Sequence, residues 1–181
     1  MKEFKEYQYF FFTDYEEEAE YLSYMNSKGY YFTYRSFGGM IYHFIEGTPC
    51  EMVYQIDYNP KALKRKDDYL QIYSDCGWEK VYSKKGYTYF RKPLALMKSE
   101  EEIYCDPESR LEMLRRIIWT RMPIILIFLL IVIPINIITS VNSDGLFSTG
   151  TFTGIVLLIA YLIMFIKVIL KYKKLKEKVQ K

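Results

Sequence analysis

Few residues of this 181-residue chain have a type and spacing that could support catalysis. His43 is the only histidine, and no serine or cysteine stands beside it in a nucleophile motif. The three cysteines, Cys50, Cys76 and Cys105, lack the spacing of zinc ligands. An odd cysteine count without a secretion signal is typical of reduced cytosolic thiols. We therefore expect no enzymatic activity, no metal and no cofactor.

Carboxylates provide one candidate for a binding residue. Asp57 falls at a predicted strand end in "YQIDY", although a turn-forming aspartate explains it better. In "CDPESR", helix capping and a first-turn acid account for Asp106 and Glu108. We do not expect nucleic-acid binding, because the soluble part is not basic and acids such as Glu16–Glu18 repel phosphate.

Two apolar segments, 122–140 and 152–170, are long enough to cross a bilayer as helices. Lysine and arginine lie before the first segment and after the second, whereas "SVNSDGLFSTG" between them contains neither. Because positive flanks stay in the cytoplasm, we predict a two-pass cell-membrane protein with cytoplasmic N- and C-termini. A buried soluble hairpin is the alternative.

The flanks of these segments contain the side chains that we expect to meet membrane lipid. "CDPESRLEMLRR" predicts either a short amphipathic helix at the inner interface or the first turns of a longer transmembrane helix. Tryptophan favours headgroup depth, and cations near a helix end favour the headgroups. The expected lipid-facing anchors are Arg115, Arg116, Trp119, Arg121, Lys171, Lys173 and Lys174.

Two segments of the soluble part resemble each other. "EYLSYMNSKGYYF" and "DYLQIYSDCGWEK" align at an offset of 48 residues, the separation of Gly29 and Gly77. Each predicts a helix that ends at a glycine in the left-handed conformation. Turns at Gly38-Gly39 and Lys85-Gly86 predict a hairpin after each helix. One unit alone would bury too little apolar surface to be stable, so two units would share a core.

The predicted elements follow the same order in both halves. The first half has a strand at 7–12, a helix starting with a capping box of Asp14 and Glu17, and strands at 30–37 and 40–47. Its helix should bury Tyr15, Ala19, Leu22 and Met25. The second half has a strand at 52–58, a helix from about Asp67, and strands at 78–83 and 87–92.

This order predicts an α+β domain with tandem β-α-β-β repeats. The repeats would form one antiparallel sheet with both helices on one face, as in the ferredoxin-like class, followed by a two-helix transmembrane hairpin. The arrangement also resembles, in topology only, the tandem units of GyrI-type ligand-binding domains.

Aromatic residues make up 18% of the chain and are concentrated in the predicted strands. A sheet covered on one face leaves the other face open, and an aromatic open face would bind a protein partner or a small apolar ligand. The alternative is that the tyrosines cover a thin core with their hydroxyls in water. The predicted binding residues are Tyr30, Tyr42, Tyr54, Asp57, Trp78 and Tyr87.

The order of motifs in residues 7–110 resembles the bacterial family known as domain of unknown function 2812. The matching pieces are "YLSYMNSKGYYF", "YHF", "YQIDY", "YLQIYSDCGWEKV", "YFRKP" and "EIYCDPESR", with Tyr30 where the family's "KGW" element has tryptophan. The resemblance implies a membrane-anchored protein of Gram-positive bacteria. It also implies a gene beside that of a PadR-like transcriptional regulator linked to drug or envelope-stress responses. It carries over no catalytic residue.

These observations predict six segments. They are a cytoplasmic domain (1–93), a linker with a juxtamembrane helix (94–116), two spans (117–140 and 152–171), an extracytoplasmic loop (141–151) and a basic cytoplasmic tail (172–181). We expect a non-enzymatic binding or regulatory protein whose aromatic domain holds a regulator or an amphipathic ligand. The alternative is an accessory subunit of a membrane transporter complex, which polar residues within a span would favour. Homo-oligomerisation stays open.

Overall fold

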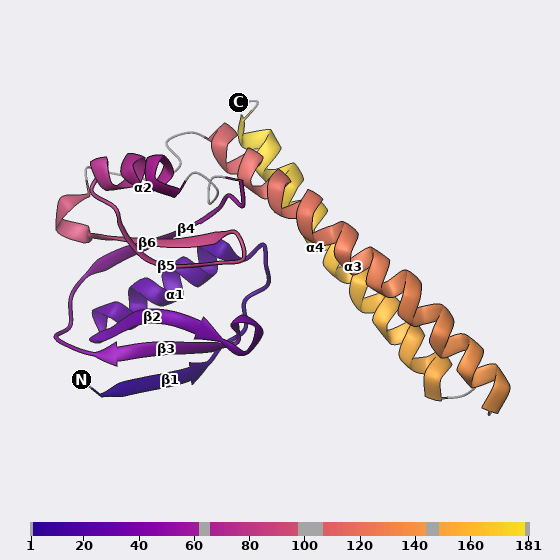
Figure 1. Cartoon of the computed structure of the whole chain (residues 1–181). Helices are drawn as coiled ribbons and strands as arrows, with labels where there is room; N and C mark the ends of the chain where they lie inside the picture. The colour runs from indigo at the N-terminus through magenta and orange to yellow at the C-terminus, as the bar shows by residue number, and fades with distance from the viewer. Residues whose placement is uncertain (1, 62–65, 98–106, 144–148, 180–181) are drawn as a thin grey trace. The chain divides into compact units, whose positions relative to one another are not determined.

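The computed structural model describes residues 2–61, 66–97, 107–143 and 149–179 (Figure 1). The chain divides into two compact units, Met1–Ser109 and Arg110–Lys181. The boundary therefore falls between the predicted ends of the soluble domain and of the juxtamembrane segment. Residues Cys105 and Asp106, named in the sequence-based predictions, and part of the predicted loop 141–151 lie outside the described residues.

The first unit contains two three-stranded antiparallel sheets. The first half of the unit consists of β1 (Glu3–Tyr7), α1 (Tyr15–Ser27), β2 (Tyr30–Ser36), a short 3-10 helix η1 (Phe37–Gly39) and β3 (Ile41–Glu46). The second half consists of β4 (Met52–Tyr58), α2 (Lys66–Asp75), β5 (Glu79–Lys84), β6 (Tyr87–Pro93) and η3 (Leu94–Leu96). The strand orders are β1-β3-β2 and β4-β6-β5. In each sheet, the strand that comes third in the sequence therefore lies in the middle.

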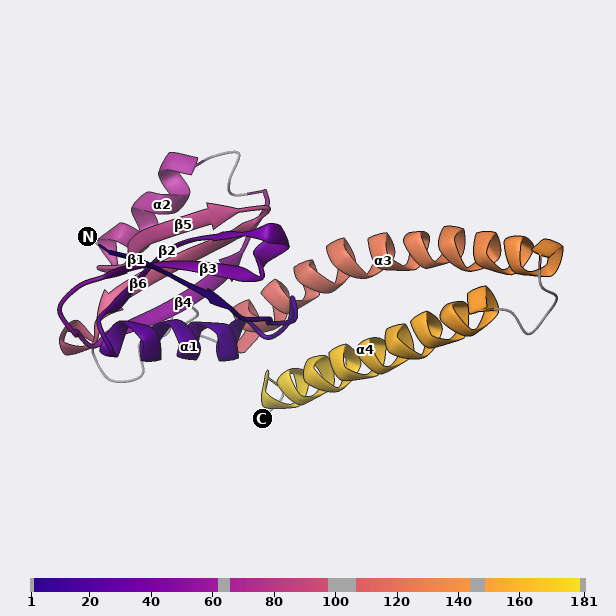
Figure 2. The same ribbon diagram turned by 90° about the horizontal axis from the view of Figure 1, so that it is seen from below.

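The two helices lie on opposite faces of the second sheet, as Figure 2 shows. Tyr54 of β4 and Tyr89 of β6 bond to α1, through the Asn26 amide and the Glu18 carboxylate respectively. Asp57 of β4 bonds to α2, and Phe90 of β6 belongs to a core cluster with residues of α2. Adjacent strand residues point to opposite faces, so this sheet lies between α1 and α2.

The prediction of one sheet with both helices on one face is therefore wrong. The physical reason is that β4 and β6 are buried on both faces, with Thr88, Tyr89 and Phe90 all nearly inaccessible in succession. Such strands contain continuous apolar runs and do not alternate. The first sheet packs against the same buried stripe of α1, since Glu18 bonds to Tyr42 of β3 as well as to Tyr89 of β6, and Figure 2 shows α1 along one side of both sheets.

The outer face of the first sheet is the face that α1 does not cover. Tyr34 and His43 stack there with ring centroids 4.0 Å apart, and the His43 Nε2 atom lies 2.8 Å from the Ser36 hydroxyl. His43 is only 8% exposed, and burial lowers its imidazole pKa. His43 is therefore packed beneath a tyrosine.

Helix α1 has the predicted buried stripe of Tyr15, Ala19, Leu22 and Met25. Asp14 is at its N-cap, but the capping box does not form. The Asp14 carboxylate instead accepts bonds from the Phe11 amide, at 3.4 Å, and from the Thr13 hydroxyl, at 3.2 Å. The first strand also lies earlier than the predicted 7–12, because β1 ends at Tyr7.

Both helix-ending glycines have the predicted positive φ, 89° at Gly29 and 78° at Gly77. Their surroundings differ. A Cβ on Gly29 would lie 2.6 Å from the Gly47 carbonyl oxygen, whereas a Cβ on Gly77 would meet only the flexible Lys92 side chain at 3.4 Å. The predicted turn between β5 and β6 is also present, with φ 52° at Lys85 and 93° at Gly86.

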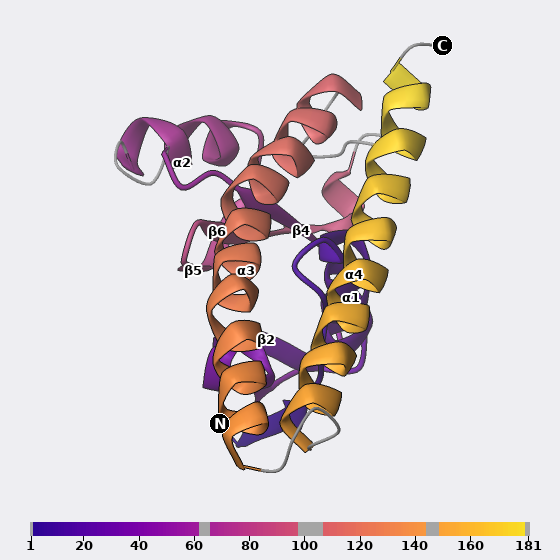
Figure 3. The same cartoon turned by 90° about the vertical axis from the view of Figure 1, so that its right-hand side faces the viewer.

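The second unit contains α3 (Pro107–Ser143) from Arg110 onward and α4 (Thr149–Val179), and the two helices lie side by side and run in opposite directions (Figure 3). Both helices are long and apolar enough to cross a membrane. Of the two alternatives for the segment before the first span, α3 fits the longer helix, because it continues unbroken from Pro107. The predicted tail from 172 is helical as far as Val179.

The predicted lipid anchors lie at the ends of these two helices. Trp119 is 71% exposed on α3. Arg116 pairs with Glu112 one turn earlier, at 3.5 Å. Arg115, Lys173 and Lys174 are exposed, and Arg116, Arg121 and Lys171 are partly exposed. Contact of these side chains with lipid stays a prediction.

Candidate functional site

The two sheets of the first unit converge at β2 and β5, each of which is an edge strand of its own sheet. The Tyr82 hydroxyl of β5 donates to the Arg35 carbonyl of β2 at 3.1 Å. The Phe32 ring lies 5.9 Å from the Tyr82 ring and 5.3 Å from that of Tyr89. We call this line of contact the seam.

Both strands at the seam have an irregular register. The pairing shifts between Phe32 and Tyr34 in β2 and between Lys80 and Tyr82 in β5. The two shifts are 48 residues apart, the offset at which the two chain segments align. Irregularities of this kind bend an edge strand and interrupt its pairing. The described strands therefore approach each other as two sheets and do not merge into one.

A groove of about 520 Å³ opens at the start of both seam strands. This volume is within the roughly 300–1,000 Å³ of typical small-molecule sites. Apolar side chains and charged side chains of both signs line it. The seam groove comprises Tyr31, Phe32, Thr33, Ile45, Glu46, Gly47, Thr48, Glu79, Lys80, Val81 and Arg91.

The polar groups of the seam groove are held in fixed positions. Arg91 Nε and Nη2 donate to the two carboxylate oxygens of Glu79, at 2.7 and 2.9 Å, and this bonding raises the pKa of Arg91. The Arg91 guanidinium carbon is 6.0 Å from the Tyr31 ring, whose hydroxyl donates to the Thr48 carbonyl at 2.6 Å. A bidentate pair beside an aromatic ring offers both a polar and an apolar contact to a ligand.

Beside the seam lies a buried carboxylate that joins both sheets to α1. Glu18 Oε1 accepts bonds from Arg35 Nη1 at 2.7 Å and from the hydroxyls of Tyr42, at 2.7 Å, and Tyr89, at 2.8 Å. Glu18 is 5% exposed. Burial raises the pKa of its carboxyl, against the lowering effects of Arg35 and the two hydroxyls. Burial likewise raises the pKa of both tyrosines.

The sequence-based reasoning missed this buried cluster. Glu18 was considered only as one of three consecutive surface acids. A signal was nevertheless present, because Glu18 is three residues after Tyr15 and four before Leu22, on the buried stripe of the helix. An acid on a buried stripe requires a partner, and the strand that contains Arg35 supplies it.

The structure does not place the six predicted binding residues on an open face. Tyr42, Tyr54, Asp57, Trp78 and Tyr87 are all buried, between 0% and 9% exposed, and Tyr30 is partly buried. The predicted exposure is wrong for the buried aromatic members. Tyr54, Trp78 and Tyr87 belong to the second half, whose sheet is covered by α1 and α2, and Tyr42 of the first sheet faces Glu18 of α1. A binding role for any of the six stays a prediction.

These residues belong to separate parts of the interior. Trp78 packs with Tyr69 and Phe90 beneath α2. The Tyr69 hydroxyl donates to the Asp57 carboxylate, which also accepts a bond from Tyr73 at 3.4 Å. Burial, reinforced by Asp57, raises the pKa of Tyr69. The structure therefore gives Asp57 and Trp78 packing partners under α2.

The other predicted residues have partners in the first unit as well. The Tyr54 hydroxyl donates to the Asn26 side-chain oxygen at 2.9 Å. The Tyr87 hydroxyl donates to the Phe12 carbonyl at 3.1 Å. The Tyr30 ring lies 4.7 Å from that of Phe4. None of the six lines the seam groove.

Taken with the second unit, this geometry defines a class of protein: an α+β domain with a grooved seam between two sheets, joined to two apolar helices of membrane-spanning length. Within this class, the chain belongs to the family described as protein of unknown function (DUF2812), which matches residues 14–129, more than half of its length. No curated protein and no solved structure matches the chain.

Proposed function

We propose that this protein is a non-enzymatic, membrane-anchored binding protein whose seam groove holds a small amphipathic ligand. The observation that carries the proposal is the groove itself, with its volume of about 520 Å³. Tyr31, Phe32 and Val81 would contact the apolar part of the ligand, and the Arg91–Glu79 pair its polar part. Binding of the ligand would then change how the domain contacts a protein partner, for which we propose a PadR-like regulator.

The way the domain is built supports a binding role. The two halves share one element order and equivalent strand orders, and we propose that they are tandem β-α-β-β units of the ferredoxin-like class. Sites between two such halves are common positions for ligands, because neither half alone closes the space. The matched irregularities in β2 and β5 keep this space open.

Two transmembrane helices would hold the domain at the inner surface of the cell membrane. We propose cytoplasmic N- and C-termini from the lysines and arginines outside the helix pair and their absence between the helices. The transporter-subunit alternative gains no support from Asn136 and Thr139. The Asn136 amide donates to the Val132 carbonyl at 2.8 Å, and the Thr139 hydroxyl to that of Ile135 at 2.9 Å, so their own helix satisfies both donors.

The proposal can be tested by NMR on the full chain in phosphatidylcholine nanodiscs. The probe is anilinonaphthalene sulfonate, an amphipathic anion, and the reporter is the δ1-methyl group of Ile45, which lines the groove. We expect a saturable chemical-shift change. Val81→Trp, which fills the groove, should abolish this change.

Ile72→Trp is the matched control, since Ile72 is 63% exposed on α2 and does not line the groove. This variant should respond as the natural protein does. An Ile45 signal that stays unchanged in the natural protein, or that shifts equally in Val81→Trp, would refute ligand binding in the seam groove.

A further inference from the structure

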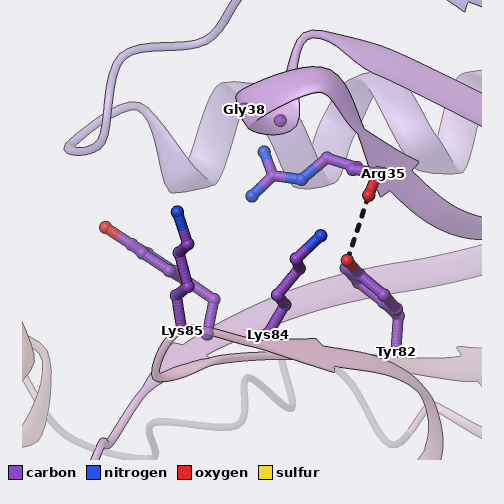
Figure 4. Close-up of a pocket in the computed structure, with 7 residues that line it drawn as sticks. Arg35, Gly38, Tyr82, Lys84 and Lys85 are labelled. Atoms are coloured by element: carbon purple, nitrogen blue, oxygen red, sulfur yellow. Dashed lines mark hydrogen bonds between the residues drawn. The ribbon is translucent and has the colours of Figure 1, made fainter.

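A second, smaller pocket lies at the other end of the seam, where three cationic side chains converge. It has a volume of about 120 Å³, and Arg35, Gly38, Gly39, Tyr82, Lys84, Lys85 and Tyr87 line it. Three cationic side chains extend into the same space (Figure 4). Arg35 lies at the end of β2 that precedes η1, Lys84 is the last residue of β5, and Lys85 lies in the β5–β6 turn. We call this site the basic pocket.

The charged residues that line the basic pocket are all cationic, and none of its lining residues is acidic. Arg35 is paired with Glu18 on its interior side. Three cations in one small space repel one another, and a bound anion would remove that repulsion.

Arg35 also retains capacity to bind a ligand. Its Nη1 atom is occupied by Glu18 and Tyr42, whereas its buried Nε–H has no hydrogen-bond partner among the described residues. Gly39 leaves the guanidinium uncovered, since a Cβ there would lie 3.5 Å from Arg35 Cζ. A planar guanidinium with donors to spare suits an oxyanion.

The backbone at Lys85 is an independent observation. Lys85 has φ 52° at the first central position of the β5–β6 turn. This left-handed conformation favours glycine, asparagine or aspartate and is strained for lysine. A strained backbone conformation that a glycine or asparagine at the same position would relieve is often found at functional sites. A lysine here places its ammonium in the basic pocket at a cost in stability.

We infer that the basic pocket binds a phosphate-type oxyanion, either a soluble phosphate or the phosphomonoester headgroup of a lipid. The negative charge of such a group matches the cationic lining of the pocket, and its oxygens can accept bonds from lysine ammonium groups and from a guanidinium. The volume admits one phosphate group. This site is separate from the seam groove and does not rest on the function proposed for it.

The test uses the ¹⁵N-labelled full chain in phosphatidylcholine nanodiscs, titrated with inorganic phosphate. The amide signals of Gly38 and Gly39 should shift and saturate. Lys84→Ala should weaken binding by about tenfold, the effect of losing one charge-assisted hydrogen bond. Lys5→Ala, which removes the same charge from an exposed position of β1 that lines neither pocket, should bind within about twofold of the natural protein.

Lys85→Gly separates binding from folding. It should raise the melting temperature of the domain, because glycine relieves the strained turn, and weaken phosphate binding by about tenfold, because the ammonium is lost. Lower stability in Lys85→Gly would show a structural role for Lys85 and would overturn the inference. Equal weakening in Lys84→Ala and Lys5→Ala would overturn it as well, since the effect would then be one of general charge.

Nanodiscs that contain phosphatidic acid distinguish the two sources. If the headgroup is the ligand, the Gly38 and Gly39 signals shift without added phosphate, and the shift is reduced in Lys84→Ala. If only soluble phosphate binds, these signals respond to phosphate alone. Either result supports a phosphate site, and the absence of both responses would refute it.

Discussion

Replacing Arg35 by methionine would show how the buried carboxylate holds the two sheets together. Methionine retains much of the side-chain volume but removes the guanidinium. The Glu18 carboxylate would keep its two tyrosine donors and lose its ionic partner. The Glu18 side chain is 6% exposed and that of Arg35 is 18% exposed, so solvent can compensate little of this loss.

The expected loss is large for a domain of this size. Breaking a buried ion pair by removing one partner costs about 3–5 kcal/mol. Because Tyr42 and Tyr89 still donate to Glu18, we expect the lower end, about 3 kcal/mol. The double variant Glu18→Gln/Arg35→Met should lose less than the sum of the single variants, with a coupling energy of about 1–3 kcal/mol.

The destabilisation should also depend on pH. Burial holds the folded-state pKa of Glu18 above its unfolded value. Its contribution to stability is therefore present below the unfolded pKa and is lost as the pH rises through the folded pKa. Removing Arg35 raises the folded pKa further. The loss in Arg35→Met, relative to the natural protein, should thus be larger at about pH 8 than at about pH 5.

Trp78 provides the assay. It is 5% exposed in the cluster beneath α2, and replacing Trp119 by phenylalanine makes it the only tryptophan. Its emission should report urea unfolding of the domain in the full chain, embedded in nanodiscs. A coupling energy below about 0.5 kcal/mol, or the same loss at both pH values, would refute this account of the pair.

Three further outcomes follow from the fold. Trp78→Ala should cost about 3–5 kcal/mol, measured by thermal unfolding with the near-ultraviolet tyrosine signal, and a small loss would contradict its core position. Gly29→Ala should cost more than Gly77→Ala, with about 1–2 kcal/mol of strain in each and a backbone clash only in the first, measured by urea unfolding. A cysteine replacing Ser143 should be labelled from outside intact cells and native Cys76 should not; the reverse would invert the proposed orientation.

The elements of this fold could be predicted from local sequence, whereas their arrangement in layers could not. Alternating apolar residues and turn residues correctly predict the hairpins after Gly29 and Gly77, because hairpin formation depends on residues that are close in the sequence. The position of α1 against both sheets depends on which face of β4 it covers. When a strand has apolar residues on both faces, its sequence does not show which face a helix covers. The predicted open aromatic face was therefore assigned to side chains that are buried.

The candidate site was harder to predict for a related reason. The groove residues Thr33 and Val81 lie at irregularities of register, and the two strands meet only after both sheets have formed. Arg35 has no local feature that distinguishes it from a surface arginine. Only the position of Glu18 on the buried stripe of the helix indicates that its carboxylate requires a cationic partner in the interior.

The buried carboxylate and the two pockets are parts of one junction. Glu18 binds Arg35 and Tyr42 from the first sheet and Tyr89 from the second, so one oxygen atom links both sheets to α1. Arg35 faces this carboxylate on one side and the basic pocket on the other. An anion that draws the guanidinium outward would weaken its bond to Glu18 and thus the link between the sheets. Because the seam groove lies between the same two sheets, occupancy of the basic pocket should alter the groove, and phosphate should change the affinity of the groove for an amphipathic probe.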